Sequence, residues 1–454
     1  MKSNLKRAVC GLLCALWMIS AGGCADTETE IRLPVFEEKS FTISGFWAPY
    51  EISAESYETY RGCGMNTLLL VNHSASPRTS ENQYYLGSAA TERALEVCAE
   101  TDLDVILNYG DYLSGSIGFT FSETPFSEYD IYGEYARLIK GIHIADEPDK
   151  EEISHYGDET LTSDFQGVYP DQKYFVNLLP SYAQPSQTGF ADYSDYLNWY
   201  AEEVLADFSG NRLLSVDFYP FRADEPMRTD WLYCYDQIAR LAKEYGAEVN
   251  YYIQSAAGKE FRNELSEAEI RMQAYMALCF SGSWISYYCY SNPLEGEGQM
   301  YDMCIVDADG TPTKLYEAVK NVNEEIFSFS DAILSFSWQG AIGIAAEGTR
   351  GGTAVRMLGS IGDFSGFRFL NSVTCGQDCV VGRYAREAEE EGYLILPWKD
   401  PAAGENVEMT LQFGNCEAVA VYGGGSTKAE FVRLQNGAMT TALNAGEGIF
   451  VVPL

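Results

Sequence analysis

The chain has 454 residues, of which 46% are hydrophobic and 21% charged, and its 66 Asp and Glu against 30 Lys and Arg give a formal net charge of −36. This length exceeds a single compact core, since domains commonly run to roughly 100–200 residues and barrels to about 250, so we expect two folded domains. So acidic a surface repels phosphate backbones and anionic headgroups, which argues against a nucleic-acid partner and against polybasic contact with a membrane.

The first 24 residues predict export. Basic residues precede an apolar run over 8–20, and small residues at 21–23 lead into Cys24. The pattern resembles a bacterial lipoprotein signal, in which the cysteine is lipidated and becomes the mature N-terminus; an ordinary cleaved secretory signal is the alternative. The apolar run is shorter than the about 20 residues that span a bilayer. We therefore expect a signal peptide over 1–24, a polar linker over 25–40, and a mature lipoprotein anchored to the membrane at the bacterial cell surface.

Short apolar runs alternate with amphipathic helical stretches from residue 41 onward. This alternation is typical of βα units built around a parallel sheet. Eight runs have the length and composition of buried strands: 42–47, 67–72, 105–109, 142–145, 174–178, 213–219, 249–254 and 284–290. The helix that follows the eighth run is expected over 314–329. Eight such units in about 285 residues predict a (β/α)8 TIM barrel over 41–330, with a doubly wound α/β sheet as the alternative.

The pattern changes after residue 330. Glycine clusters separate short alternating segments such as 407–413 and 418–422, and no convincing long helix is evident. Alternating short segments with turn residues between them are typical of antiparallel β-structure. We therefore expect a small C-terminal antiparallel β-sandwich over 331–454.

In a barrel of this kind the active site lies at the carboxyl ends of the strands. The strand ends here carry carboxylates, amides and aromatic rings with almost no Lys or Arg, a set that suits a neutral polyol better than an anionic ligand. The candidate substrate-binding residues are Trp47, His73, Asn108, Asp146, Asn177, Tyr219, Gln254 and Tyr288. The chain has three His, and the two on barrel strands, His73 and His143, lie far apart in strand order. We therefore expect no metal site and no cofactor.

The most specific segment is 141–149, Gly-Ile-His-Ile-Ala-Asp-Glu-Pro-Asp, which ends the fourth strand. Period-two alternation places His143, Ala145 and Glu147 on one face, expected to be the barrel interior. The segment resembles the fourth strand of clan A glycoside hydrolases, in which a Glu preceded by Asn (here Asp146) and often followed by Pro is the general acid/base. The resemblance implies a glycoside hydrolase with Glu147 as its catalytic acid. His143 is expected deeper, as a hydrogen-bonded core residue rather than a proton shuttle.

Two later segments, Asn-Leu-Leu-Pro at 177–180 and Asp-Phe-Tyr-Pro at 217–220, strengthen this resemblance, but the end of the seventh strand departs from it. Clan A enzymes place their nucleophilic Glu there, whereas this chain has Gln254, whose amide is a poor nucleophile. Three interpretations stay open. Asp217 is the second catalytic carboxylate, at a separation wide enough for a water molecule and hence for inversion; or Asp146 and Glu147 act together with an acetamido group of the substrate; or the site only binds glycan.

The expected function is hydrolysis of O-glycosidic bonds in oligo- or polysaccharides outside the cell, with Glu147 and Asp217 as the candidate catalytic residues. The expected partners are a carbohydrate substrate and, through the lipid on Cys24, a membrane. The alternative from another class is a non-catalytic, surface glycan-binding lipoprotein on a degenerate barrel. The β domain is expected to brace the barrel or to bind glycan.

Overall fold

The computed structural model describes residues 32–39, 41–71, 84, 86–109, 126, 132–208, 211–293, 301–386 and 389–454. Residues Leu33–Leu454 form one compact unit. Within the described ranges, no helix combines the length and the apolar character needed to cross a bilayer.

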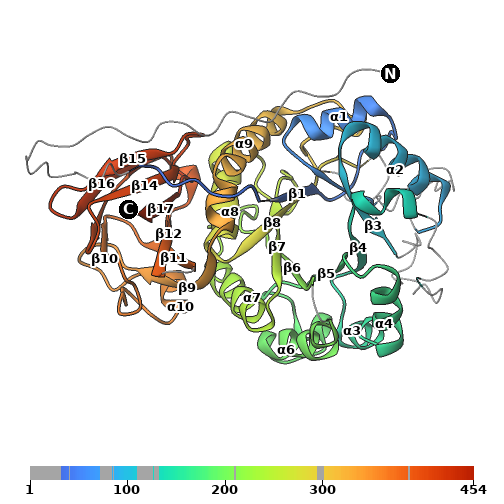
Figure 1. Ribbon diagram of the computed structural model, residues 1–454, viewed down its shortest axis with the longest axis horizontal. Coiled ribbons are helices and arrows are strands. Elements are labelled where there is room, and N and C mark those ends of the chain that lie inside the picture. Colours follow the sequence, from blue (N-terminus) through green and yellow to red (C-terminus); the bar gives the residue numbers. More distant parts are fainter. Residues whose placement is uncertain are drawn as a thin grey trace, which may run out of the picture. The chain divides into compact units, whose positions relative to one another are not determined.

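Eight parallel strands form the first sheet, in the order β1-β8-β7-β6-β5-β4-β3-β2. The strands are β1 (Thr42–Gly45), β2 (Thr67–Leu69), β3 (Asp104–Asn108), β4 (Ile139–Asp146), β5 (Lys173–Leu178), β6 (Leu213–Asp217), β7 (Glu248–Gln254) and β8 (Gly282–Tyr288). Each coincides with one of the eight predicted runs. In Figure 1 the strands lie inside a ring of helices. The predicted fold class, a (β/α)8 barrel followed by antiparallel β-structure, is confirmed.

Backbone bonds also join the β1 and β2 segments, which stand at the two ends of this strand order. The Asn66 amide N–H donates to the Ile43 carbonyl (3.1 Å) and the Ala48 N–H donates to the Val71 carbonyl (3.2 Å). At the start of β1 the side chain of Asn66 adds two bonds, since it accepts from the Ile43 N–H at 2.9 Å and donates to the Phe41 carbonyl at 2.7 Å. An asparagine thus supplies the pairing that the short β2 cannot, and the barrel is nearly closed.

The helices cover the outside of the barrel in chain order (Figure 1). They are α1 (Ala54–Gly62), α2 (Ala89–Thr101), α3 (Lys150–Tyr156), α4 (Glu159–Val168), α5 (Pro185–Thr188), α6 (Tyr193–Glu203), α7 (Trp231–Tyr245), α8 (Glu267–Cys279) and α9 (Lys314–Leu334), with 3₁₀ turns at η2 (Gly133–Leu138) and η3 (Leu205–Asp207). Helix α9 begins where predicted and runs five residues further, because Ile326, Phe329 and Ile333 continue its buried face.

The last part of the chain forms two antiparallel sheets, ordered β15-β14-β17-β12-β11-β9 and β10-β13-β16. Their elements are β9 (Ser337–Ile344), α10 (Thr353–Met357), β10 (Leu370–Cys375), β11 (Cys379–Arg386), β12 (Glu390–Pro397), η5 (Pro401–Ala403), β13 (Val407–Phe413), β14 (Ala418–Gly423), β15 (Glu430–Arg433), β16 (Ala438–Leu443) and β17 (Ile449–Pro453). Apolar side chains from both sheets, among them Val381, Ile395 and Leu411, form a common core.

Helix α8 connects the barrel with the six-stranded sheet. It is buried on nearly all sides, as expected for a helix that packs against structure on both of its faces. Its last carbonyls, which lack partners within the helix, accept hydrogen bonds from the sheet: Trp338 Nε1 donates to Cys279 O at 2.9 Å, and the Tyr384 hydroxyl donates to Leu278 O. Gly382 permits this approach, because a Cβ there would lie 2.6 Å from the Cys279 carbonyl. The sheet therefore completes the end of a barrel helix.

Candidate active site

A cavity of about 390 Å³ lies at the carboxyl ends of the barrel strands. Its walls combine carboxyl groups, amides, one arginine and several aromatic rings. The lining residues are Phe46, Asp146, Glu147, Asn177, Tyr182, Gln187, Asp217, Tyr219, Arg222, Tyr252, Glu260, Phe261, Tyr288 and Tyr301. Both candidate catalytic residues, Glu147 and Asp217, therefore line one cavity.

The end of β4 does not follow the simple alternation expected from the sequence. Opposite β5, His143 pairs with Phe175 and Ala145 with the next residue, Val176, so β4 carries one extra residue at a β-bulge. The bulge shifts the alternation, and Asp146 rather than Ala145 takes the inward position. Ala145 packs instead in the core outside the lumen. The prediction that His143, Ala145 and Glu147 share one face is therefore wrong.

Glu147 reaches the cavity by a different backbone route. Its φ of +52° lies in the left-handed region, where few non-glycine residues are found. Its N–H donates to the Asn177 carbonyl at 2.8 Å, which extends the pairing of β4 with β5 by one residue. Pro148 follows, and Asp149 then caps α3 by accepting from the N–H groups of Glu151 and Glu152. The strained residue is thus fixed between a strand end and a helix cap, and such strain is common at functional sites.

Three carboxyl groups meet around the amide of Asn177. Asn177 Nδ2 donates to Asp146 Oδ1 at 3.1 Å and to Asp217 Oδ1 at 3.2 Å. Asp217 is only 3% exposed, and its carboxyl is in hydrogen-bond contact with that of Glu147. The wide separation that inversion requires, roughly 6.5–9.5 Å between carboxyls, is therefore absent between Glu147 and Asp217 in this arrangement.

The three carboxyls hold protons more tightly than ordinary side chains do. Burial raises the pKa of Asp146 to about 6, against the opposing effect of the Asn177 hydrogen bond. Burial and then the charge of Asp146 raise the pKa of Glu147 to about 7. Burial and then the charges of Glu147 and Asp146 raise the pKa of Asp217 well above its usual value. Near neutral pH the cluster consequently shares protons, and Glu147 is poised to give one up or take one.

A chain of hydrogen bonds through the barrel lumen orients the Asn177 amide. Ser215 Oγ donates to Asn177 Oδ1 at 2.9 Å, and Asn250 Nδ2 donates to Ser215 Oγ at 2.8 Å. Ser286 Oγ donates to Asn250 Oδ1 at 2.8 Å and lies 2.7 Å from Ser44 Oγ. Because Asn177 Oδ1 is occupied as an acceptor, its Nδ2 must point at the carboxyls. Strands β1, β8, β7 and β6 together thus fix the donor that the carboxyls share.

Aromatic rings form most of the remaining wall. Tyr219 and Tyr288 lie 5.0 Å apart between ring centroids, and Phe261 is stacked on Tyr301 at 5.5 Å. The hydroxyls of Tyr288 and Tyr301 are 3.0 Å apart. Such rings offer flat apolar faces with polar edges, which suits the C–H faces and hydroxyls of a sugar.

Two of the predicted binding residues lie close to the cavity but are not part of its lining. Trp47, in a left-handed conformation with φ of +64°, packs behind the wall at 5.5 Å from the ring of Tyr288. Asn108, at the end of β3, is 4% exposed and donates to the Tyr84 carbonyl at 2.9 Å. Both support the wall, and neither faces the cavity.

Gln254, expected at the pocket, is fully buried and is not part of the cavity lining. Its Oε1 accepts from the Phe221 N–H at 3.2 Å, and its Nε2 donates to the carbonyls of Phe221 (3.1 Å) and Ala256 (3.3 Å). The backbone of Gln254 is bonded in turn to the side chain of Gln273, at 2.7 and 3.0 Å. The amide is therefore a structural link between the loops after β6 and β7, because every polar atom of its side chain has a protein partner.

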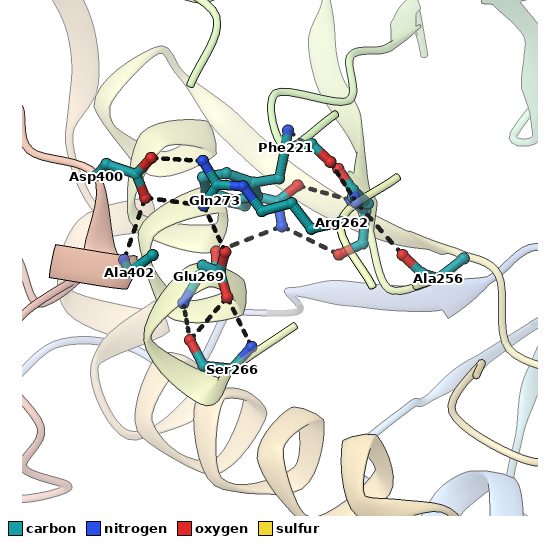
Figure 2. A network of polar contacts seen from close by, with 9 residues as sticks. Phe221, Ala256, Arg262, Ser266, Glu269, Gln273, Asp400 and Ala402 are labelled. Carbon is teal, nitrogen blue, oxygen red and sulfur yellow. Dashed lines mark hydrogen bonds and ion pairs between the residues drawn. The ribbon is translucent and has the colours of Figure 1, made fainter. Parts of the chain in front are cut away.

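Figure 2 shows the wider network to which this link belongs. Arg262 donates to Glu269 at 2.7 Å and to Asp400 of the C-terminal region at 2.9 Å, and its N–H donates to the Phe221 carbonyl at 3.1 Å. Glu269 also accepts from the Ser266 N–H at 2.8 Å, in the capping box that starts α8. Residues at the start of α8 and in η5 thus brace the two loops that carry Tyr219 and Phe261 into the cavity.

His143 is 1% exposed and packs edge-on against Phe175 at 5.5 Å. Burial lowers its pKa to about 3, and its Nε2 has no hydrogen-bond partner among the described residues. It is a buried core residue, as expected. His73 and Cys24, which were also predicted as site residues, lie outside the described residues.

Several cavity residues were not identified from the sequence, namely Phe46, Tyr182, Gln187, Arg222, Tyr252, Glu260, Phe261 and Tyr301. Most of them lie in loops after the strands, where residue type alone does not show which side chains turn inward. Arg222 is the one basic residue among the described residues of this lining. Within the described ranges, no group of three or more His, Cys, Asp or Glu is arranged to hold a metal ion.

No model of a known protein family matches this chain, and no curated protein matches it. Similar solved structures include a GH30 endoxylanase from Clostridium papyrosolvens C71, at 12% identity over 91% of this chain and 95% of that one, with a TM-score of 0.43. A beta-galactosidase from the psychrophilic Marinomonas ef1 is 10% identical over 67% of this chain and 63% of that one, with a TM-score of 0.45. An exo-beta-1,4-mannosidase from Opitutaceae bacterium strain TAV5 is 14% identical over 64% and 60%, with a TM-score of 0.38.

This chain accordingly spans less than two thirds of the length of the beta-galactosidase and of the mannosidase. These solved structures are of glycoside hydrolases. The protein is a (β/α)8 barrel with an attached antiparallel β-sandwich.

Proposed function

We propose that the protein is a glycoside hydrolase that cleaves O-glycosidic bonds in oligo- or polysaccharides, with Glu147 as the general acid. The observation that carries the proposal is the meeting of Asp146, Glu147 and Asp217 at the wall of one aromatic-lined cavity. Buried structural carboxylates are normally neutralised by cations, whereas here burial raises the pKa of all three, and repulsion by neighbouring carboxylates raises those of Glu147 and Asp217 further. Clustered carboxyls with raised pKa values are typical of acid/base sites.

In the proposed reaction Glu147 donates its proton to the glycosidic oxygen as the bond from that oxygen to the anomeric carbon breaks. Water supplies the hydroxyl that ends on the anomeric carbon, and its second proton returns to a carboxylate of the cluster. With a pKa of about 7, Glu147 is protonated in a substantial fraction of molecules at neutral pH. The contact between Glu147 and Asp217 must open to admit the substrate oxygen, because the two carboxyls now occupy each other's hydrogen-bonding positions.

Two candidates suit the role of the second catalytic group in this scheme. Asp217 can act as base or nucleophile once the substrate separates it from Glu147. Alternatively, an acetamido group of the substrate attacks the anomeric carbon, with Asp146 orienting it. The inward position of Asp146, which the β-bulge of β4 creates, is what keeps this second route open.

A non-catalytic glycan receptor is the second candidate function. The burial of Gln254 favours it, because the end of β7 then offers the cavity no nucleophile. Under this alternative the aromatic wall and the carboxyls would bind sugar hydroxyls without turnover.

Glu147→Gln separates the two functions. The amide keeps the shape and polarity of the side chain but cannot donate an acidic proton, so we expect hydrolysis to fall by about 10²–10⁴ while sugar binding persists. The exposed Glu151, four residues further along, supplies the matched control Glu151→Gln, which should leave the rate unchanged. Purified protein is assayed against a panel of glycans and aryl glycosides. Hydrolysis by Glu147→Gln at the wild-type rate would mean that another residue is the acid. If the wild type and the variant both bind sugar and neither cleaves it, the receptor function is favoured.

We also propose that the protein is exported and anchored through a lipid on Cys24. The proposal rests on the basic, apolar and small-residue pattern of the first 24 residues. Expressed in a bacterial host, the full chain should partition with membranes, and Cys24→Ala should release it. A wild-type chain found entirely in the detergent-free soluble fraction would contradict the anchor.

A further inference from the structure

Arg222 differs in its surroundings from the other cavity residues. It is the only Lys or Arg among the described residues that line the cavity. It follows Phe221 in the loop after β6, where its backbone forms an antiparallel bridge with Phe261, another lining residue. The Phe221 peptide is in turn held by the network of Figure 2. The position of Arg222 at the cavity wall is therefore well fixed.

The guanidinium of Arg222 has no acceptor within the described part of the chain. It forms neither an ion pair nor a side-chain hydrogen bond there, and its one contact is the face of Phe261, 5.3 Å from the ring centroid. Three other partly buried arginines each bind carboxylates: Arg262, Arg271 and Arg383. In a chain with a net charge of −36, acceptors are abundant. An arginine that faces a cavity with its donors unused is thus unusual here.

Arg222 does not serve to neutralise the catalytic carboxyls. The effects that set the pKa of Glu147 are burial, Asp146 and Asp217, and the charge of Arg222 is not among them. Burial and then the charges of Asp217 and Glu147 raise the pKa of Tyr182, and the Arg222 charge opposes them. Glu260 acts instead on the pKa of Tyr301, which burial raises. The guanidinium forms no ion pair among the described residues and is available to a ligand.

We propose that Arg222 binds an acidic substituent of the substrate, so that the site is specific for anionic sugars. The shared chemistry is an oxyanion, either the carboxylate of a uronic or sialic acid or a sulfate ester. A guanidinium offers two parallel N–H donors to such a group, and the ring of Phe261 beneath it holds the plane of the fork in place. The proposal rests on the proposed function for its sugar ligand, and it adds the class of sugar.

The acidic surroundings make such a residue necessary for an anionic ligand. A protein of this net charge repels anions at long range. This repulsion weakens the binding of an acidic sugar unless a fixed cation in the site offsets it. A neutral sugar gains nothing from an unpaired guanidinium in the wall, whose donors it would have to satisfy with hydroxyls alone.

The test compares binding of matched acidic and neutral sugars by calorimetry, which needs no turnover. The probes are galacturonate and galactose 6-sulfate against galactose, glucuronate against glucose, and polygalacturonan against its neutral methyl ester. We expect at least one acidic member to bind about tenfold or more tightly than its neutral partner, with a preference that weakens as salt rises. The carboxylate and sulfate probes distinguish the two sources of the oxyanion.

Arg222→Met should abolish this preference, and Arg222→Lys should retain part of it, because a single ammonium keeps the charge but loses the fork. Arg350→Met removes one exposed arginine from the C-terminal region and should change nothing. Equal binding of acidic and neutral probes, an acidic preference that survives Arg222→Met, or no binding of any acidic probe would each overturn the proposal. Cleavage of neutral glycans alone would overturn it and leave the hydrolase intact, whereas acidic binding without cleavage would support Arg222 and refute the hydrolase.

Discussion

Strands β4, β6 and β7 all end at the same edge of the barrel. The carboxyls at the ends of β4 and β6 line the cavity, whereas the amide at the end of β7 is bonded to protein. Asp146, Glu147 and Asp217 line one cavity, and the Asn177 amide donates to both Asp146 and Asp217. Gln254 has every side-chain donor and acceptor bonded to protein and no exposed surface. In the family that the fourth strand resembles, the ends of the fourth and seventh strands both carry carboxylates. Here the end of β4 carries carboxyls that a ligand could contact, whereas the end of β7 does not.

The comparison shows that position in the fold locates a site without deciding which residues act in it. A buried polar group that is fully hydrogen-bonded stabilises the structure and has nothing left for a substrate. A buried carboxyl with a raised pKa, or a cation without an acceptor, can be stabilised by a bound ligand. By this criterion we propose that the carboxyl cluster and Arg222 engage a ligand, whereas Gln254 is structural.

Replacing Asp217 by Asn tests the functional side of the comparison and should have the largest effect. If Asp217 is the base or nucleophile, the loss of its carboxylate should lower the rate of hydrolysis by about 10²–10⁴ with little change in sugar binding. The exposed Asp207 provides the control Asp207→Asn. Turnover near that of the wild type would instead favour assistance by a substrate acetamido group, which a comparison of N-acetylated and unmodified aryl glycosides would show directly.

Gln254→Glu tests the structural side. A carboxylate at this position resembles the missing nucleophile, but it cannot donate to the carbonyls of Phe221 and Ala256, which now accept from Nε2 at 3.1 and 3.3 Å. The Ala256 carbonyl would lose its donor, the Phe221 carbonyl would keep only the Arg262 N–H, and the buried charge would keep only the Phe221 N–H. The free energy of unfolding should therefore fall by on the order of 4 kcal/mol. Urea denaturation at pH 7 measures the loss.

The exposed Gln435 supplies the control Gln435→Glu, which should be neutral. We expect no gain of hydrolysis from Gln254→Glu, since the side chain does not reach the cavity. A stable Gln254→Glu variant with increased turnover would mean that the end of β7 is a degenerate catalytic position after all.

The fold was predictable because its signals are local. The barrel strands are short apolar runs that alternate with helices, and several helices have recognisable caps, such as the Ser266–Glu269 capping box at α8. Glu147 and Asp217 were predictable as strand-end residues for the same reason. Neither assignment needs the side chains to be placed in three dimensions.

The remainder of the site depends on features that leave no periodic signal. The β-bulge at His143–Ala145 arises from the register with β5, and it moved Asp146 rather than Ala145 to the inner face. Gln254 does not line the cavity, because its side-chain amide is hydrogen-bonded to both the N–H and the carbonyl of Phe221. Arg222 and Phe261 face each other only because two loops pair across the cavity wall. Each of these outcomes is decided by residues distant in the sequence.

His143→Phe sharpens the comparison inside the lumen. Burial lowers the pKa of His143 from 6.5 to about 3, so the folded protein holds it neutral while the unfolded chain protonates it below 6.5. The neutral histidine is therefore compatible with full stability above pH 6.5, and stability is lost as the pH falls toward 3. At pH 4.5 this amounts to about 3 kcal/mol. Urea denaturation measures the free energy of unfolding of the wild type and of His143→Phe at pH 7 and 4.5. Between these two pH values, it should fall by about 3 kcal/mol less in the variant than in the wild type. An equal fall in both proteins would contradict a buried neutral histidine.

Ser215→Ala should have the smallest effect, and it tests whether the lumen chain of hydrogen bonds controls the carboxyls. Without the Ser215 hydroxyl, Asn177 Oδ1 loses its donor and Asn250 Nδ2 loses its acceptor, so the Asn177 amide is free to rotate. The hydrogen bond from Asn177 lowers the pKa of Asp146 and of Asp217 against the larger effect of burial. Its loss should raise both pKa values further, each by somewhat less than one unit, since one hydrogen bond contributes about 1 kcal/mol.

The shift should appear in carbon-13 NMR titrations of protein labelled at aspartate carboxyls, and as an acid limb of the pH–rate profile moved to higher pH. Maximal turnover should fall by less than about tenfold, because the acid itself is untouched. Ser215→Thr keeps the hydroxyl and should restore the titration even if the added methyl group costs some stability. Unchanged aspartate titrations in Ser215→Ala would show that Asn177 holds its orientation without the lumen, and equal shifts in Ser215→Thr would attribute the effect to packing rather than to the hydrogen bond.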